Sequence, residues 1–118
     1  APRGLPERAP GREAARMSPP ELSLVLACWN EAPWLERSVR EIRRELDAAG
    51  LSYELVFVDD ASTDGTREVI RRLLAEPALR GRAVFHGSNT GRGGALADGF
   101  RAAEGEIAGF IDAALKNR

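Results

Sequence analysis

Two adjacent acids, Asp59 and Asp60, follow the apolar run YELVFV at residues 53–58. Successive side chains of a strand point to opposite faces, so one carboxylate is expected to face the following helix and the other a cleft. Burying such a pair is costly unless hydrogen-bond donors satisfy it. The pair could begin a turn and cap the helix that starts near Asp64, or it could accept hydrogen bonds from a base or a ribose. The residue types leave both interpretations open.

A glycine-rich stretch at residues 89–95 reads NTGRGGA. Backbone amides at a helix start, glycines that permit close approach and the positive charge of Arg92 together suit a phosphate group. A tight connection from strand to helix, with small residues for helix packing, explains the stretch about as well. The dinucleotide-binding fingerprint follows the first strand of its fold, where this chain has CWNE at residues 28–31. A nicotinamide-binding domain is therefore disfavoured.

Other reactive or aromatic side chains have ordinary explanations. The only histidine, His86, is predicted to be a partly buried turn residue, and the only cysteine, Cys28, a small core residue. Trp29 and Trp34 are predicted to pack under the first loop, although either could stack on a base.

Alternating hydrophobic patterns predict the elements that position these residues. Short apolar runs predict strands at residues 22–28, 53–58, 83–86 and 107–111. Helical spacing predicts helices between residues 33 and 50, after Asp64, and from about residue 94 to 103. Strands that alternate with helices imply right-handed crossovers. We therefore predict an α/β fold with an open, mainly parallel sheet of about four strands and helices on both faces.

Polar residues follow every predicted strand. Asn30 and Glu31 follow the first strand, Asp59 and Asp60 the second, Asn89 and the glycines the third, and Asp112 the fourth. In open parallel sheets, ligands bind beyond the carboxyl ends of the strands. The four strand ends therefore predict one binding site at a single edge of the sheet.

Composition bounds the class of protein. The 118 residues suit one domain, with residues 1–20 predicted to be a disordered tail rich in proline and arginine and residues 21–118 the folded part. Basic and acidic residues number 17 and 18, which leaves no basic excess for nucleic acid. The single cysteine and the lack of an apolar run of roughly 20 residues predict a cytoplasmic protein without a membrane segment.

Four motifs, in order, resemble one known family. LSLVLACWNEAPWL, YELVFVDDASTDGT, NTGRGGALADGF and GEIAGFIDA are similar to the amino-terminal half of family 2 glycosyltransferases of GT-A fold. The resemblance is greatest to the dolichyl- or polyprenyl-phosphate mannose synthase-like branch. It covers roughly residues 21 to 114, and VDDASTDGT is its most specific part.

The resemblance implies a Rossmann-like half-sheet that binds a nucleoside diphosphate sugar for transfer to an acceptor, such as a polyprenyl phosphate. It places next to the donor Asn30, Glu31, Asp59, Asp60, Asn89, Gly91, Arg92 and Gly93. It also implies that Asp112 is the first acid of a D-x-D motif, which holds Mg²⁺ or Mn²⁺ against the diphosphate of the donor.

Two departures from the family alter this expectation. Ala114 replaces the second acid of the D-x-D motif, so we expect weak metal binding. The sequence stops at Arg118, whereas family members continue into an acceptor-binding half that supplies the catalytic base. We therefore expect a truncated domain that is inactive in transfer, is marginally stable and self-associates through an exposed sheet edge. The alternative is a non-catalytic nucleotide-binding or interaction module.

Overall fold

The fold is an α/β sandwich built on one five-stranded sheet, in strand order β1-β4-β3-β2-β5. The computed structural model describes residues 7–8 and 18–113. Its elements are β1 (Glu7–Arg8), β2 (Leu22–Cys28), α1 (Leu35–Ala48), β3 (Tyr53–Asp59), α2 (Thr66–Leu74), β4 (Gly81–Phe85), α3 (Gly91–Ala102) and β5 (Ile107–Asp112). Strands β2 to β5 are parallel to one another, and β1 pairs antiparallel with β4.

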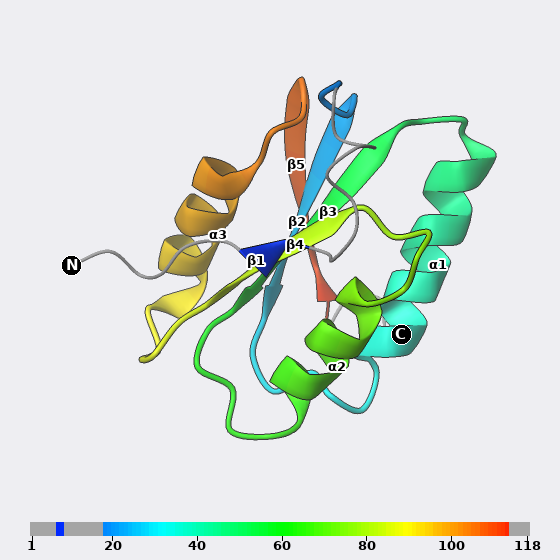
Figure 1. The fold of residues 1–118 in the computed structure, drawn as a ribbon. Coiled ribbons are helices and arrows are strands. Elements are labelled where there is room, and N and C mark those ends of the chain that lie inside the picture. Colours follow the sequence, from blue (N-terminus) through cyan, green and yellow to red (C-terminus); the bar gives the residue numbers. More distant parts are fainter. Residues whose placement is uncertain (1–6, 9–17, 114–118) are drawn as a thin grey trace.

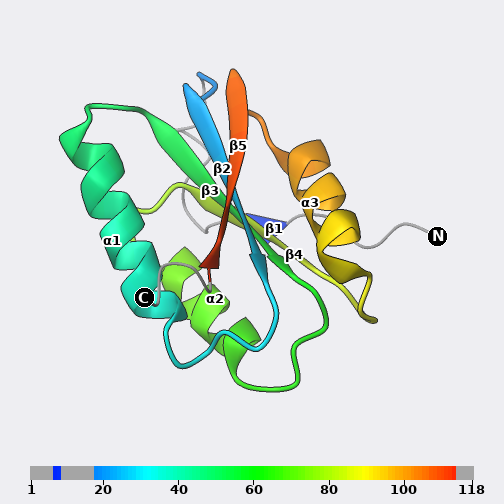
Figure 2. The same ribbon diagram turned by 180° about the vertical axis from the view of Figure 1, so that it is seen from behind.

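Helices cover both faces of the sheet. Figure 1 shows α1 and α2 on one side and α3 on the other, and Figure 2 shows the same three layers from behind. The predicted α/β class and the predicted parallel sheet of four strands are confirmed.

Two boundaries differ from the sequence prediction. Helix α3 begins at Gly91 rather than near residue 94, so the glycines form its first turn instead of a loop. Glu7 and Arg8, inside the segment predicted to be disordered, form β1 on the outer edge of β4. Main-chain groups of an edge strand can pair with almost any sequence, which is why the polar composition of this segment did not predict the strand. The other residues of that segment up to residue 17 lie outside the described part of the chain.

The core consists of two layers, one on each side of the sheet. Leu26, Leu55 and Phe57 pack against α1 and α2, whereas Val25 and Val56 pack against α3. All of them are fully buried. Because β3 is covered on both faces, its side chains are apolar without alternation, as is usual for a parallel sheet.

Helix α3 lies very close to the sheet because glycine occupies the point of contact. A Cβ atom added at Gly99 would lie 2.3 Å from Cγ1 of Val25 and 3.1 Å from Cγ2 of Val58. Any larger residue would push the helix outward. The position of α3 matters for the site, since its first turn faces the carboxyl ends of the strands.

A buried ionic cluster fixes the other end of α3. Arg82 Nε lies 3.0 Å from Glu54 Oε1, and these side chains are 2% and 0% exposed. Arg82 also donates to the Ala102 carbonyl, at the end of α3, and pairs with Glu104 just beyond it. Glu54 accepts from the Ser23 hydroxyl and from the Glu104 amide. The cluster therefore joins β2, β3 and β4 to the carboxyl end of α3.

Strand β5 forms one edge of the sheet and carries apolar side chains that lack cover. Ile107 is 69% exposed and Phe110 51% exposed. Phe110 packs edge-to-face against Phe100 of α3, which is itself 39% exposed. Within residues 7–8 and 18–113, no strand pairs with the outer side of β5.

Candidate functional site

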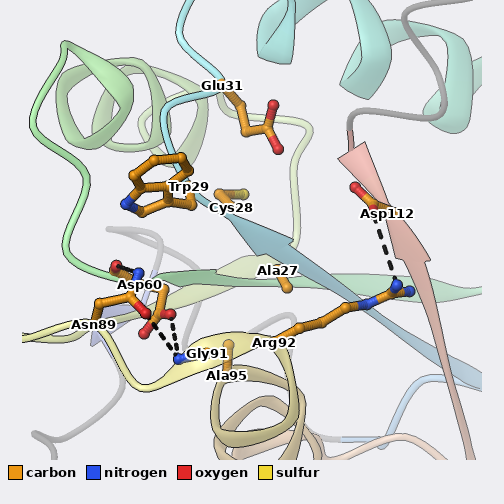
Figure 3. A pocket seen from close by; sticks show the side chains of 10 residues that line it. All are labelled: Ala27, Cys28, Trp29, Glu31, Asp60, Asn89, Gly91, Arg92, Ala95 and Asp112. Atoms are coloured by element: carbon orange, nitrogen blue, oxygen red, sulfur yellow. Dashed lines mark hydrogen bonds and ion pairs between the residues drawn. The ribbon is translucent and has the colours of Figure 1, made fainter.

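A pocket of about 320 Å³ lies beyond the carboxyl ends of β2, β3 and β5 and beside the first turn of α3 (Figure 3). Its lining combines acids, one cation, one aromatic ring and small residues: Ala27, Cys28, Trp29, Glu31, Asp60, Asn89, Gly91, Arg92, Ala95 and Asp112. Six of the nine residues that the family resemblance assigned to the donor or the metal line it, namely Glu31, Asp60, Asn89, Gly91, Arg92 and Asp112. The geometry therefore brings together residues from three strand ends and one helix.

Asp60 lines the pocket, and its carboxylate accepts hydrogen bonds at the amino terminus of α3. Its Oδ1 accepts from the Thr90 amide at 2.8 Å and from the Thr90 hydroxyl at 2.8 Å, and its Oδ2 accepts from the Gly91 amide at 2.9 Å. Nδ1 of His86 lies 2.8 Å from Oδ1. Burial alone would raise the pKa of Asp60, but the hydrogen bonds from His86, Thr90 and Gly91 outweigh it, so this pKa lies below its ordinary value.

Of the two explanations left open for the glycine-rich stretch, these contacts favour the tight connection from strand to helix. The Thr90 and Gly91 amides already donate to the Asp60 carboxylate. A helix amino terminus attracts anions through its dipole and its unpaired amides, and here a carboxylate of the same chain takes that place. The positive φ of 78° at Gly91, in the left-handed region, is the feature of this turn that requires glycine.

Asp59 and Asn30 do not line the pocket. The Asp59 carboxylate is fully buried, accepts from Nε of Arg67 at 2.8 Å and bonds to Ser62. The side-chain Oδ1 of Asn30 accepts from the main-chain N–H of Thr63 at 2.8 Å, and the main-chain N–H of Asn30 donates to the Ser62 hydroxyl. Both residues thus brace the loop after β3. As strand alternation predicted, Asp59 faces α2 and Asp60 faces the pocket.

Arg92 and Asp112 face one another across the pocket mouth. Arg92 Nη1 lies 3.8 Å from Asp112 Oδ2, with side chains 57% and 29% exposed. The Arg92 guanidinium also lies over the Phe110 ring, 5.6 Å from its centroid. Such a long, exposed ion pair contributes little stability, so it can open for a ligand at small cost. Gly93, one residue further along α3, does not line the pocket.

Glu31 and Cys28 form the inner wall on the β2 side. Glu31 is 7% exposed and its Oε1 accepts from Nε1 of Trp34 at 2.7 Å. Burial raises the pKa of Glu31, the Trp34 hydrogen bond opposes the rise, and the charge of Asp112 adds to it. Burial also raises the pKa of the Cys28 thiol, and Glu31, Asp59 and Asp112 raise it further. Cys28 is thus a buried residue of the core, as predicted, and its raised pKa disfavours the reactive thiolate.

Two features of the site were missed from the sequence. Trp29 was predicted to pack under the first loop, but it is 54% exposed and lines the pocket. It follows the last residue of β2, where the chain leaves the sheet, so it is not covered by a helix. His86 was predicted to be partly buried, yet it is 2% exposed and contacts two carboxylates. An aromatic residue directly after a strand was the available signal for Trp29.

The described residues do not form a metal site of their own. Between residues 18 and 113, no group of three or more His, Cys, Asp or Glu side chains is arranged to hold an ion. Asp112 and Glu31 contribute carboxylate oxygens to the pocket, whereas the Asp60 carboxylate is occupied by donors. Ala114 lies outside the described residues and has no oxygen ligand in its side chain.

None of the helices in the described part of the chain has both the length and the apolar character that a membrane span requires.

An open parallel sheet with a pocket beyond its strand ends defines an α/β ligand-binding protein. Residues 23–114 match the family model described as Glycosyl transferase family 2. The chain belongs to this family, and the resemblance noted from its motifs is confirmed.

The related proteins share the fold over a limited part of their length. The chain is 32% identical over 96 residues to undecaprenyl-phosphate 4-deoxy-4-formamido-L-arabinose transferase of Edwardsiella ictaluri, a match that covers 81% of this chain and 30% of that protein. It is 36% identical over 101 residues to dodecaprenyl-phosphate galacturonate synthase of Rhizobium johnstonii, covering 82% and 29%. The chain thus spans less than a third of the length of these relatives.

A solved structure likewise shares the fold over a limited part of its length. The mannosyltransferase of Pyrobaculum calidifontis, in complex with GDP-Man and Mn²⁺, superposes with a TM-score of 0.67 at 32% identity. The match covers 82% of this chain and 28% of the mannosyltransferase. The described fold is thus the amino-terminal part of a GT-A glycosyltransferase fold.

The role of Asp60 generates a pH prediction. A carboxyl with a lowered folded pKa stabilises the fold above its unfolded pKa of about 3.9, and this contribution is lost as the pH falls through the folded value. We expect Asp60→Asn to lower the free energy of unfolding by about 1 to 3 kcal/mol near neutral pH. Because protonation removes the same contribution from the wild type, the difference should shrink on acidification. Urea denaturation of both proteins at neutral pH and at acidic pH measures this difference in the free energy of unfolding.

The matched control is Glu106→Gln, which removes a carboxylate from an exposed position. It should change the free energy of unfolding by less than about 0.5 kcal/mol. An Asp60→Asn protein as stable as the wild type at neutral pH would contradict the capping role of Asp60.

Proposed function

We propose that residues 21–113 form the donor-binding part of a glycosyltransferase and bind a nucleoside diphosphate sugar in the pocket beside α3. The observation that carries this proposal is the convergence of Trp29, Asp60, Arg92 and Asp112 on one pocket of about 320 Å³ at the carboxyl ends of parallel strands. A pocket of this volume is at the lower end of the range for small-molecule sites. The mannosyltransferase of similar fold is in complex with GDP-Man, which supports the same ligand class here.

The chemistry of the pocket suggests how the donor lies in it. Trp29 offers an exposed aromatic face on which a base can stack. Asn89, whose Nδ2 donates to the Asp60 carbonyl, borders the same end of the pocket. Arg92 is the one cation among the lining residues, so we place the diphosphate near it and the base near Trp29 and Asp60.

The remaining residues assigned by resemblance have supporting roles in this proposal. Glu31 lines the wall next to Asp112. Asn30 and Asp59 hold the loop that carries Asp60, through Thr63, Ser62 and Arg67. Gly93 has no contact role in the described structure, since a Cβ there would meet nothing within 4 Å.

We also propose that a divalent cation binds in the pocket together with the donor. Asp112 would be its ligand from the described residues, and the diphosphate of the donor would supply further oxygens. When bound, such an ion offsets negative charge on the leaving diphosphate. Since Ala114 offers no second carboxylate, we propose that this chain binds the ion weakly and does not transfer sugar by itself.

The acceptor is proposed from the relatives. Two of them are named for undecaprenyl phosphate and dodecaprenyl phosphate, so a polyprenyl phosphate is the acceptor class that we propose for the complete enzyme. The cytoplasmic location expected from the single cysteine stays a prediction.

Donor binding should be visible in stability and fluorescence. A ligand that binds only the folded state must raise the melting temperature, so one of GDP-, UDP- or dTDP-sugars should raise it. The same ligand should quench Trp29 emission.

We expect Trp29→Ala to weaken binding by about tenfold or more, which is the usual effect of losing a stacked aromatic ring. Trp34→Phe is the control, because Trp34 bonds to Glu31 and does not line the pocket. If none of the sugars shifts melting, the donor-binding proposal fails.

The cation proposal is tested by restoring the missing acid. We expect Mn²⁺ to change the donor affinity of the wild type little, and Ala114→Asp to make the affinity Mn²⁺-dependent by about 10- to 100-fold. Ala114→Asn, similar in size but uncharged, is the matched control and should gain much less. Donor turnover measured with and without Mn²⁺ completes the test: metal-dependent turnover by the wild type would overturn the inactivity proposal.

We also propose self-association through β5, as expected from its exposed edge. Ile107 is 69% exposed on β5, which is the last strand of the sheet among the described residues, and edge strands of this kind can pair with other chains. Sedimentation velocity should show a concentration-dependent species that Ile107→Lys reduces. Leu51→Lys is the control, since Leu51 is 39% exposed in the turn before β3. A wild type that stays monomeric across the concentration range would refute the proposal.

A further inference from the structure

His86 is the only histidine of the chain, lies directly after β4 and contacts Asp60, which lines the pocket. Its side chain is 1% exposed. Nδ1 lies 2.8 Å from Asp60 Oδ1, and Nε2 lies 2.8 Å from Asp98 Oδ2. The ring therefore bridges the loop after β3 and helix α3.

The two carboxylates constrain which nitrogens of the His86 ring carry a proton. An ionised carboxylate only accepts hydrogen bonds, and a neutral imidazole has a single N–H donor. If both carboxylates are ionised, His86 satisfies both of them only when each ring nitrogen carries a proton, which would make the ring a buried cation. If it lost one proton, a lone pair would face one of the two carboxylates at hydrogen-bond distance.

The other charged groups around the ring are already paired. From α2, Arg67 donates to the His86 carbonyl and pairs with Asp59. From α3, Arg101 pairs with the other oxygen of Asp98. The Thr90 hydroxyl lies 3.2 Å from Nδ1. The ring itself is thus faced by two acids and by one hydroxyl, while the guanidinium groups bind elsewhere.

The protonation state of the His86 ring affects the pocket through Asp60. The same carboxylate that contacts His86 accepts from the Thr90 and Gly91 amides, and Asp60 and Gly91 both line the pocket. We propose that the charged ring of His86, held between Asp60 and Asp98, is a positioning residue for this pocket wall, and that donor binding weakens when the ring loses its second proton. The binding part of this inference rests on the proposed donor-binding function; the positional part does not.

The positional part is tested without any ligand. Because the chain has one histidine, ¹⁵N-histidine labelling gives an unambiguous NMR signal for each ring nitrogen. We expect both nitrogens to be protonated at the acid end of a pH series, and we expect the loss of one proton to move the Gly91 and Thr90 amide signals in parallel. A ring with one unprotonated nitrogen throughout, or a ring titration that leaves both amides unmoved, would overturn the inference.

Asp98→Asn is the informative variant. Its side-chain amide can donate to an unprotonated Nε2 or, after a flip, accept from a protonated one, so the ring keeps two partners in either state. We expect this variant to hold the Gly91 amide signal constant from pH about 6 to about 9, whereas Glu106→Gln, which removes an exposed acid, keeps the wild-type response. This variant retains the histidine, so the test does not depend on a His86 substitution that could fail to fold. An Asp98→Asn protein with the wild-type pH response would overturn the inference.

Donor affinity separates this inference from the proposed function. A nucleotide sugar is the probe, because its diphosphate is esterified at both ends and does not titrate in this range. Wild-type affinity should fall by about tenfold or more between pH about 6 and about 9, and Asp98→Asn should remove this fall. Donor binding that is independent of pH in the wild type would overturn the inference and leave the function intact. If no nucleotide sugar binds but the NMR responses hold, the proposed function fails while the positional role of His86 stands.

Discussion

The Asp60 carboxylate is the contact on which the geometry of the site depends. It joins the end of β3 to the first turn of α3, where it accepts two main-chain N–H groups and the Thr90 hydroxyl. Burying a carboxylate at 4% exposure would be costly without these donors, and the amino terminus of a helix is a favourable place for its charge. The first turn of α3 is thereby fixed beside the strand ends, so the pocket has a wall before any ligand arrives.

The remainder of α3 is held by contacts that keep this wall rigid. Gly99 allows the helix to touch Val25 and Val58 closely, and the buried Arg82 and Glu54 side chains bind its carboxyl end. A buried ion pair is weak evidence for stability, but it permits few alternative positions of the groups that it joins. The opposite face of the sheet differs, because α1 and α2 meet it mainly through large apolar residues. Helix α3 is therefore held by polar contacts at both ends, and on the opposite face Arg67 of α2 adds contacts with Asp59 and with the His86 carbonyl.

The sequence predicts this fold well where the signal is local and poorly where partners are distant. The apolar runs and helical spacings predicted the four parallel strands and three helices, and strand alternation predicted that Asp59 and Asp60 face opposite ways. The partner of Asp60 was not predictable, since the Gly91 amide is 31 residues away and main-chain donors leave no trace in side-chain pattern. The contact of Arg82 with Glu54 and the contact of Asp98 with His86 also join residues of different elements, so no local pattern predicts them. Trp29 was misassigned because burial was inferred from residue type, whereas the chain turns away from the sheet directly after Cys28.

The charges of the pocket limit how an anionic ligand can enter it. Glu31, Asp60 and Asp112 line the pocket together with the single cation Arg92. The Asp60 carboxylate already accepts hydrogen bonds from its donors and Glu31 is 7% exposed, so Arg92 and Asp112 are the charges most accessible to a ligand. A diphosphate that approached Arg92 would compete with Asp112 for the guanidinium and would face that carboxylate at close range. A divalent cation between the diphosphate and Asp112 would turn this repulsion into attraction. The side chain of Ala114 supplies neither an oxygen ligand for such an ion nor a charge of its own.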